Sequence, residues 1–317
     1  MPAPVIAVLE DHLRLESEIG GQAAALRRAE GIEAVHGSLA RLVGAAPETI
    51  ALATNATRAW QLAFYGLPFG PGDRILTSRA EYGSNYVAFL QMRKRTGCRI
   101  EVIPDDGTDA TDPAALDEMI DPRVKLVALT WVPTNGGLVT PAAGIGEVAR
   151  AHGVLYLLDA CQAIGQLPAD VAELGCDFLY GTARNGLRGP RGTGFLYVAP
   201  HMLDRLEPAM LDHAGARWLD EESYEMRGDA RRYETYERAI GGVVGLGAAV
   251  DYALGLGIER IARRVGALAA YMRAELARRP ASSCAIWAPR DAASSPSPTP
   301  ACRRAPFATA WRRRASK

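Results

Sequence analysis

The sequence predicts an α/β fold in which a mainly parallel β-sheet is covered by helices on both faces. From residue 50 to residue 198, short apolar segments of strand length alternate with amphipathic segments that have a helical period. Segments such as residues 126–131 are apolar almost throughout, which is typical of strands buried on both faces. The chain has 317 residues, 48% of them hydrophobic, so it is long enough to bury a large core. The repeated strand–helix–strand order therefore favours a parallel sheet.

The predicted elements follow one another in a regular order. Residues 10–43 carry apolar side chains at three- and four-residue intervals, and the simplest interpretation is two helices with a break near Gly31. The predicted strands then cover residues 50–53, 74–77, 99–103, 126–131, 155–159, 178–180 and 194–198. The predicted helices between them cover residues 58–65, 85–96, 113–120 and 141–152. A long loop that contains Trp218 and Tyr224 leads to two further helices, at residues 241–254 and 258–278.

The chain is predicted to divide into three parts. Residues 1–255 form the large domain, and residues 256–279 form a helix that leads into a truncated small domain. Residues 280–317 are dominated by Ala, Ser, Pro and Arg and have no period of two or 3.6, which is typical of disorder. A shifted reading frame is the alternative, because reading plausible codons two bases later from Ala285 gives a better strand sequence.

Composition excludes several classes of partner. Lys and Arg total 36 and Asp and Glu total 36, so the net charge is zero and nothing favours nucleic acid or an anionic membrane. The apolar runs are far shorter than the roughly 20 residues that span a bilayer, and residues 1–20 are too charged for a secretory signal. A cytoplasmic protein is therefore expected. The five cysteines lack CxxC or Cys/His spacing, so we expect free thiols and no metal.

Polar loops follow five of the predicted strands. The carboxyl ends of parallel strands meet at one edge of a sheet, where such folds bind their ligands. We therefore expect these loops to form one site. They cover residues 54–57, 81–85, 133–137, 159–162 and 181–182.

Four side chains in these loops are suited to binding an aromatic ring. Asp159 follows a very apolar strand, and a carboxylate in that place can pair with a protonated ring nitrogen. Gln162 can reach a ring hydroxyl, Tyr82 can stack on the ring, and Asn135 can donate a hydrogen bond to its oxygen. The alternatives are that Asp159 caps the following helix and that Tyr82 is a packing residue.

The segment Asn55-Ala56-Thr57 precedes a predicted helix and is a candidate phosphate site. Backbone N–H groups at a helix N-terminus attract anions, and the Thr57 hydroxyl adds a donor. The alternative is an ordinary N-cap without a ligand.

Together these segments resemble the class V aminotransferase family of fold type I pyridoxal phosphate enzymes, particularly its isopenicillin N epimerase-like and cysteine desulfurase-like branch. The resemblance covers roughly residues 1–279. The segments that carry it are NATRAWQLAFY (residues 55–65), EYGSN (81–85), VPTNGGLV (132–139), LLDACQ (157–162), LRGPRGTGFLYV (187–198) and RRYETYER (231–238).

The resemblance implies a fold type I three-layer sandwich with the small C-terminal domain largely missing, pyridoxal 5'-phosphate (PLP) as cofactor and an amino acid as substrate. It also implies a homodimer, in which residues 232–235 extend toward the cofactor of the neighbouring subunit. The expected cofactor contacts are the phosphate on Ala56, Thr57 and Thr182, the ring on Tyr82, the ring nitrogen on Asp159, and the ring oxygen near Gln162 and Asn135.

The chain departs from the family pattern at Asn185, where family members carry the Schiff-base lysine. A carboxamide cannot form the Schiff base or act as a general base, so PLP is expected to bind noncovalently. Neither Lys94 nor Lys125 lies on a predicted site loop. The start of the chain also resembles an internal point of family sequences, so we expect it to be truncated.

Three functional hypotheses follow. The chain is a PLP enzyme of the epimerase, lyase, desulfurase or transaminase type, impaired by Asn185; or it is a noncatalytic scaffold; or it is a damaged gene product. A Rossmann dehydrogenase is disfavoured, because the glycines of residues 189–194 precede a strand rather than a helix.

Overall fold

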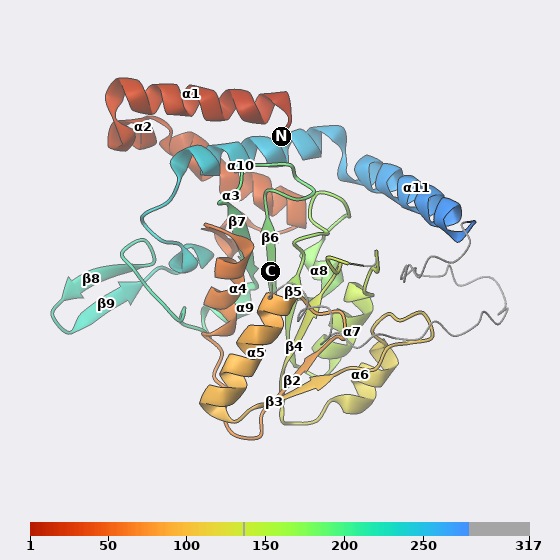
Figure 1. Ribbon diagram of the computed structural model, residues 1–317. Coiled ribbons are helices and arrows are strands. Elements are labelled where there is room, and N and C mark those ends of the chain that lie inside the picture. The colour runs from red at the N-terminus through yellow and green to blue at the C-terminus, as the bar shows by residue number, and fades with distance from the viewer. Residues whose placement is uncertain (136, 279–317) are drawn as a thin grey trace, which may run out of the picture.

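The computed structural model describes residues 1–135 and 137–278, and its centre is a seven-stranded sheet (Figure 1). The spatial order of the strands is β1-β7-β6-β5-β4-β2-β3. Strand β7 runs antiparallel to its neighbours β1 and β6, and all other pairs are parallel. The predicted α/β class and mainly parallel sheet are confirmed. The strands are β1 (Ile50–Ala53), β2 (Arg74–Thr77), β3 (Arg99–Val102), β4 (Val124–Thr130), β5 (Leu155–Asp159), β6 (Phe178–Thr182) and β7 (Gly194–Val198).

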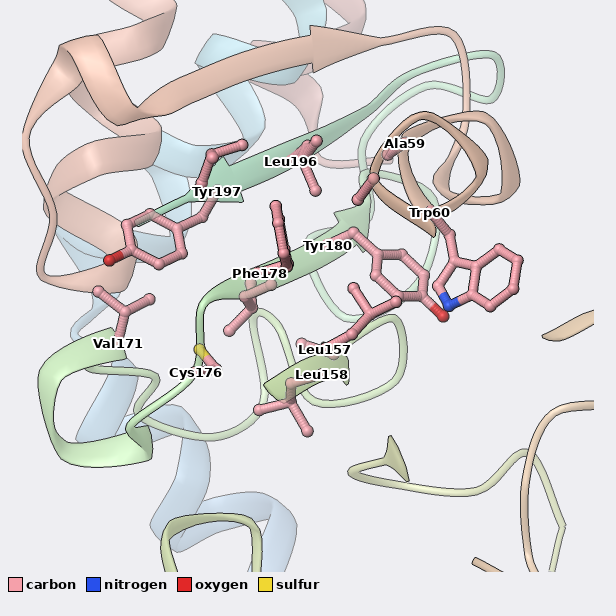
Figure 2. Close-up of a cluster of buried hydrophobic side chains, with 14 of the residues drawn as sticks. Ala59, Trp60, Leu157, Leu158, Val171, Cys176, Phe178, Tyr180, Leu196 and Tyr197 are labelled. Atoms are coloured by element: carbon pink, nitrogen blue, oxygen red, sulfur yellow. The ribbon is translucent and has the colours of Figure 1, made fainter. Parts of the chain in front are cut away.

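The central strands are buried because both of their faces are apolar. Every residue of β6 and β7 is buried, and so are all residues of β5 except Leu155. Figure 2 shows side chains of these three strands, among them Leu157, Phe178 and Leu196, gathered with Ala59 and Trp60 of helix α4 (Ala56–Phe64). Burial of such side chains contributes about 1.5–3 kcal/mol each, so this cluster fixes the position of α4 on the sheet.

Helices cover the sheet and one of its ends. Helix α4 packs on β6 and β7, α7 on β5, and α3 on β1, while α10 lies alongside α1 and α3 (Figure 1). The other helices are α1 (Ala3–Ile19), α2 (Gly21–Arg27), α3 (Ala29–Val43), α5 (Gly83–Thr96), α6 (Pro113–Met119), α7 (Ala142–Ala151), α8 (Val171–Leu174), α9 (Pro200–Leu203), α10 (Ile240–Leu256) and α11 (Ile258–Ala277), with 3-10 turns η1 (Pro47–Thr49) and η2 (Ala230–Tyr233).

The predicted break near Gly31 is wrong. The N-terminal region contains three helices, which are interrupted at Gly20 and at Arg28. Gly20 has a φ of 83°, a conformation that ends α1 and that glycine adopts without a steric penalty. Gly31 instead lies in the first turn of α3, where a glycine is tolerated.

The predicted long loop contains an antiparallel hairpin, formed by β8 (Ala216–Asp220) and β9 (Ser223–Met226), in which Trp218 pairs with Tyr224. Most of its side chains are exposed on both faces. A strand that buries neither face shows no apolar alternation, which is why the sequence pattern missed it.

The predictions for residues 280–317, disorder or a shifted frame, lie outside the described residues, and the division into domains stays a prediction.

Among the residues that the structure describes, no single helix is long and apolar enough to cross a membrane. Only α10 and α11 together meet that length and composition, and they are bent by 79° at the break between them.

A buried carboxylate ties the segment after the hairpin to the sheet. Glu234 is 6% exposed, and its Oε1 accepts hydrogen bonds from His36 Nε2 at 2.7 Å and from the Leu52 backbone nitrogen at 2.8 Å. Its Oε2 pairs with Arg238. Burial on its own would raise the pKa of Glu234, but the hydrogen bond and charge of His36, with the contacts from Leu52 and Arg238, hold it below its ordinary value. Glu234 therefore joins β1, α3 and residues 234–238.

We predict that Glu234→Gln destabilises the fold mainly at neutral pH. Because the folded pKa of Glu234 is lowered, the stability that it contributes is present above the unfolded pKa and is lost as the pH falls through the folded pKa. The expected loss is about 2 kcal/mol at pH 7, the magnitude of a hydrogen bond to a charged group, and less in acid. Urea unfolding of both proteins at several pH values measures it.

The matched control is Glu225→Gln, which removes an exposed ion pair with Arg217. Exposed pairs contribute little, so a change below about 0.5 kcal/mol is expected. An E234Q defect that is equally large in acid and at neutral pH would contradict the role of the ionised carboxylate.

Candidate functional site

Three strand ends meet at one corner of the sheet. Gly194, the first residue of β7, lies in register between Ala53, the last residue of β1, and Thr182, the last residue of β6. A Cβ built on Gly194 would lie 3.0 Å from the backbone nitrogen of Ala56 and 2.7 Å from the carbonyl oxygen of Gly181. Only glycine fits this approach without moving backbone. The corner thus brings Thr182 and the N-terminus of α4 together.

The first N–H groups of α4 are free at this corner. Asn55 is the N-cap, and its Oδ1 accepts a hydrogen bond from the Arg58 backbone nitrogen at 2.8 Å. Asn55 therefore caps α4, and the absence or presence of a ligand at this cap stays a prediction. The backbone N–H groups of Ala56 and Thr57, however, donate to no acceptor in the part of the chain that the structure describes. These two donors and the positive end of the helix dipole can hold an anion such as a phosphate.

Asp159 is buried at the carboxyl end of β5 and is 4% exposed. Its Oδ1 accepts a hydrogen bond from the Cys161 backbone nitrogen at 2.9 Å, and its Oδ2 accepts one from Asn85 Nδ2 at 3.2 Å. Burial raises the pKa of Asp159, and hydrogen bonds from Tyr180, Cys161 and Asn85 offset part of that rise. The residues after Asp159 form turns, so the carboxylate fixes a turn rather than capping a helix.

A second acidic residue, which the sequence analysis did not single out, lies beside Asp159. Glu81 Oε1 accepts hydrogen bonds from Thr130 Oγ1 at 2.7 Å, Asn85 Nδ2 at 2.8 Å and the Tyr82 backbone nitrogen at 3.0 Å. Burial raises the pKa of Glu81 to about 7, with a further rise from the negative charge of Asp159 and an opposing effect of the hydrogen bonds. The only sequence feature that could have pointed to Glu81 is its position in the second predicted polar loop, residues 81–85.

Asn185 ties the segment after β6 to the predicted site loop of residues 159–162. Its Nδ2 donates a hydrogen bond to the Cys161 carbonyl oxygen at 3.1 Å, and its Oδ1 accepts one from Arg184 Nη1 at 2.7 Å. Cys161 lies between Asp159 and Gln162, so Asn185 lies next to the loop that carries two of the four predicted ring contacts. Burial and the nearby Asp159 raise the pKa of the Cys161 thiol well above its ordinary value, so this cysteine is an inert neighbour.

No lysine among residues 1–135 and 137–278 lies near Asn185. Lys94 is exposed on α5, twelve residues after Tyr82, which corresponds to roughly 18 Å along a helix. Lys125 is exposed near the start of β4, five residues and roughly 16 Å from Thr130 at the other end of the strand. Neither can supply an amine at this edge of the sheet.

The remaining predicted residues lie at the same edge but are not joined by hydrogen bonds. Tyr82 is 42% exposed at the start of α5, and its backbone nitrogen also donates to Thr130 Oγ1 at 3.1 Å. Asn135 is exposed in the loop after β4. Gln162 is half-buried after β5, and its carbonyl oxygen accepts a hydrogen bond from Gln166. Within the described residues, no side-chain hydrogen bond links Tyr82, Asn135 and Gln162 to one another.

The donor set fits an anionic aromatic ligand that is held without a covalent bond. Free helix N–H groups and the neighbouring Thr57 and Thr182 are suited to a phosphate, and Asp159 is suited to a protonated ring nitrogen. An amine for a covalent link is missing from this set. The described part of the chain also has no group of three or more His, Cys, Asp or Glu side chains that could hold a metal ion.

The architecture is that of fold type I PLP-dependent proteins, and in particular of cysteine desulfurases. An apo cysteine desulfurase from Thermococcus onnurineus NA1 superposes with a TM-score of 0.79 and 25% identity, over 87% of this chain and 70% of that one. A C-DES mutant in which a lysine is replaced by alanine, with glycine covalently linked to its PLP cofactor, superposes with a TM-score of 0.81 and 23% identity, over 90% and 78%.

The chain belongs to the aminotransferase class-V family, whose model matches residues 1–298. A probable cysteine desulfurase from Methanothermobacter thermautotrophicus is 30% identical over 82% of this chain and 66% of its own length. The chain spans 60% to 67% of the length of three such relatives, so their activities are not transferred to it by similarity alone.

We predict that Gly194→Ala closes the corner between β7 and α4. The added methyl group would meet backbone atoms of Gly181 and Ala56, and relieving such overpacking costs about 1–3 kcal/mol. Chemical denaturation of the variant and the parent protein measures the loss.

Gly83→Ala is the matched control for this change. Position 83 lies in the first turn of α5, and a Cβ there has no heavy atom within 4 Å. Its substitution is expected to leave stability unchanged or slightly raised. Equal stability of the Gly194→Ala variant and the parent would show that the corner is not closed as described.

Proposed function

We propose that this chain is a class V aminotransferase-like protein that binds PLP noncovalently, together with an amino acid, and whose covalent catalysis is impaired. The observation that carries the proposal is the Asn185 side chain. It bridges Arg184 and the Cys161 carbonyl at the place where the family pattern has a lysine. A carboxamide there can position the Asp159 loop but cannot attack a carbonyl group.

Binding is supported by the free N–H groups at the start of α4 and by the buried Asp159. Ala56, Thr57 and Thr182 would hold the phosphate, Asp159 the ring nitrogen, and Tyr82 the face of the ring. Gln162 and Asn135 would lie near the ring oxygen. When bound, PLP supplies a ring that accepts electrons from an attached amino acid.

The residues of this chain can bind and orient the ring, but they do not supply every group that the reaction needs. Asp159, through its anionic charge, favours a protonated ring nitrogen, and the phosphate corner fixes the ring's position. The step that is missing is movement of a proton at the α-carbon, since Asn185 has no basic atom. We therefore favour an epimerase, lyase, desulfurase or transaminase ancestry with lost or much reduced turnover.

A noncatalytic scaffold is the second candidate. The hydrogen bonds of Asn185 favour it, because they give the residue a structural role that a lysine would not need. The two candidates differ in one measurable property: when the lysine is restored, an impaired enzyme regains both covalent PLP binding and turnover of an amino acid, whereas a scaffold gains no turnover.

We further propose a homodimer that forms through the β8–β9 hairpin. Trp218 is 76% exposed, Leu219 49% and Tyr224 52%, and large apolar side chains gathered on one projecting hairpin are typical of an interface. The hairpin projects from the body of the protein (Figure 1). It precedes residues 232–235, which the family resemblance places toward a neighbouring subunit and of which Arg232, Tyr233 and Glu234 are buried within this chain. The cytoplasmic location stays a prediction.

We predict that PLP binds the unchanged chain reversibly and binds the Asn185→Lys variant covalently. PLP should quench protein fluorescence in both proteins, and pyridoxal without the phosphate should bind at least about tenfold more weakly, because it lacks the contacts at α4. After borohydride reduction and denaturation, mass spectrometry should find PLP attached only to the variant, at position 185.

Asn185→Met is the matched control, because its side chain is similar in size to lysine but has no amine. It should bind PLP reversibly and show no attached PLP after reduction. Covalent PLP on the unchanged protein, at any lysine, would overturn the proposed noncovalent mode. Absence of binding by both the parent and the Asn185→Lys variant would overturn the placement of the site.

We predict that Trp218→Asp weakens the dimer. Loss of a central interface aromatic costs about 2 kcal/mol, equivalent to a roughly 30-fold higher dissociation constant. Sedimentation velocity over a range of protein concentrations measures this constant. Tyr271→Asp is the control, because Tyr271 is 67% exposed on α11, away from the hairpin. A monomeric parent protein, or equal effects of the two substitutions, would exclude the hairpin as the interface.

A further inference from the structure

Glu81 and Asp159 form a pair of carboxyl groups joined by one amide. Asn85 Nδ2 lies 2.8 Å from Glu81 Oε1 and 3.2 Å from Asp159 Oδ2, and it also donates to the Tyr180 hydroxyl at 2.8 Å. Asn85 is 4% exposed, so water does not replace these contacts easily. Two carboxylates that share one desolvated amide repel each other, and such a pair favours holding one proton.

The hydrogen bonds around the pair decide which group holds that proton. Asp159 is surrounded by donors: the Cys161 N–H on Oδ1, the Asn85 amide on Oδ2, and the Tyr180 hydroxyl. A proton on Asp159 would find no acceptor without turning one of these donors away.

Glu81 has a different surrounding. Its Oε1 accepts three hydrogen bonds, and among the described residues its Oε2 accepts one, from Thr77 Oγ1 at 3.1 Å. A hydroxyl both donates and accepts, so a proton on Oε2 can be donated to Thr77 once the Thr77 hydroxyl rotates, and the three contacts of Oε1 are kept. Thr77 is the buried last residue of β2 and is held by the strand.

We propose that Glu81 is a positioning residue that carries the single proton of this pair and thereby keeps Asp159 ionised and aligned through Asn85. The consequence for a bound ring rests on the proposed function, because it is the ionised Asp159 that would face the ring nitrogen. The protonation of Glu81 itself does not depend on any ligand.

The charged and titratable groups around the pair agree with this assignment. They are Tyr156 and Asp159 on β5, Tyr180 on β6 and Cys161 after β5, while β2 and β4 contribute the hydroxyls of Thr77 and Thr130. Arg184 acts on Cys161. In the described chain, no Lys, Arg or His forms an ion pair with Glu81 or Asp159, so no cation favours full ionisation of both. Burial accordingly raises the pKa of Glu81 to about 7.

The first test uses the protein without added PLP and compares Glu81→Gln with the parent. The glutamine amide can donate to Thr77 as the protonated acid does, so the fold is expected to persist. Infrared spectra at pH 6 should show a protonated-carboxyl band in the parent that is lost in Glu81→Gln and kept in Glu118→Gln, an exposed control on α6. A band that Glu81→Gln leaves unchanged would overturn the proposal.

The second test follows thermal unfolding as a function of pH. Since the folded pKa of Glu81 is raised, its contribution to stability is present below the unfolded pKa and is lost as the pH rises through about 7. The melting temperature of Glu81→Gln should therefore rise relative to the parent by about 5 °C between pH 5 and pH 8. Parallel curves for the two proteins would contradict a titrating Glu81.

The third test measures PLP binding and separates this proposal from the proposed function. Glu81→Ala should weaken PLP binding about tenfold and Glu81→Gln should restore it, because glutamine keeps the contacts to Asn85 and Thr77. Equal affinity of Glu81→Ala and the parent would exclude a positioning role. If none of the proteins binds PLP, the proposed function fails, and the infrared and thermal tests still decide where the proton lies.

Discussion

The burial of the Asp159 carboxylate is the constraint on which the arrangement of this site depends. An ionised carboxylate inside an apolar sheet is stable only where hydrogen-bond donors replace water. Here the donors come from three elements: the turn after β5 gives the Cys161 N–H, β6 gives Tyr180 and α5 gives Asn85. Asp159 therefore fixes the position of α5 relative to β5 and β6, and with it the loop that carries Tyr82.

The corner at the ends of β1 and β6 and the start of β7 follows from sheet register rather than from charge. Because β7 is antiparallel, its first residue lies at the same edge as the last residues of β1 and β6. Gly194 allows the start of α4 to approach that edge, so two backbone N–H groups and the Thr182 region converge there. The corner is thus built from backbone, which a change at Asn185 does not disturb.

Most of the fold was predictable because its strands are buried on both faces. All seven strands of the sheet lie within two residues of their predicted bounds, since continuous apolar runs between polar loops leave few alternative assignments. The β8–β9 hairpin and the breaks at Gly20 and Arg28 were missed because exposed strands and short helix interruptions leave no apolar period. At the site, Asp159, Thr182 and the start of α4 could be predicted from their positions after strands. Glu81 could not be assigned a role from its place in a polar loop, because its link to Asp159 runs through Asn85 and spans 78 residues of sequence, which periodicity does not encode.

Asn185 can keep the structural contacts of its loop but cannot replace the amine of a lysine. A lysine at this position both anchors the cofactor and moves the proton, whereas the carboxamide forms hydrogen bonds to Cys161 and Arg184 and so holds the Asp159 loop in place. Loss of the amine therefore need not loosen the site, because the donors to Asp159 and the N–H groups of α4 come from elsewhere in the fold. Under the proposed function, affinity for a phosphate-bearing ring would come from the corner, from Asp159 and from the loop residues around them, none of which needs the amine. Position 185, by contrast, offers no basic side chain, so the contacts that the fold supplies for binding are independent of the amine that the reaction would need.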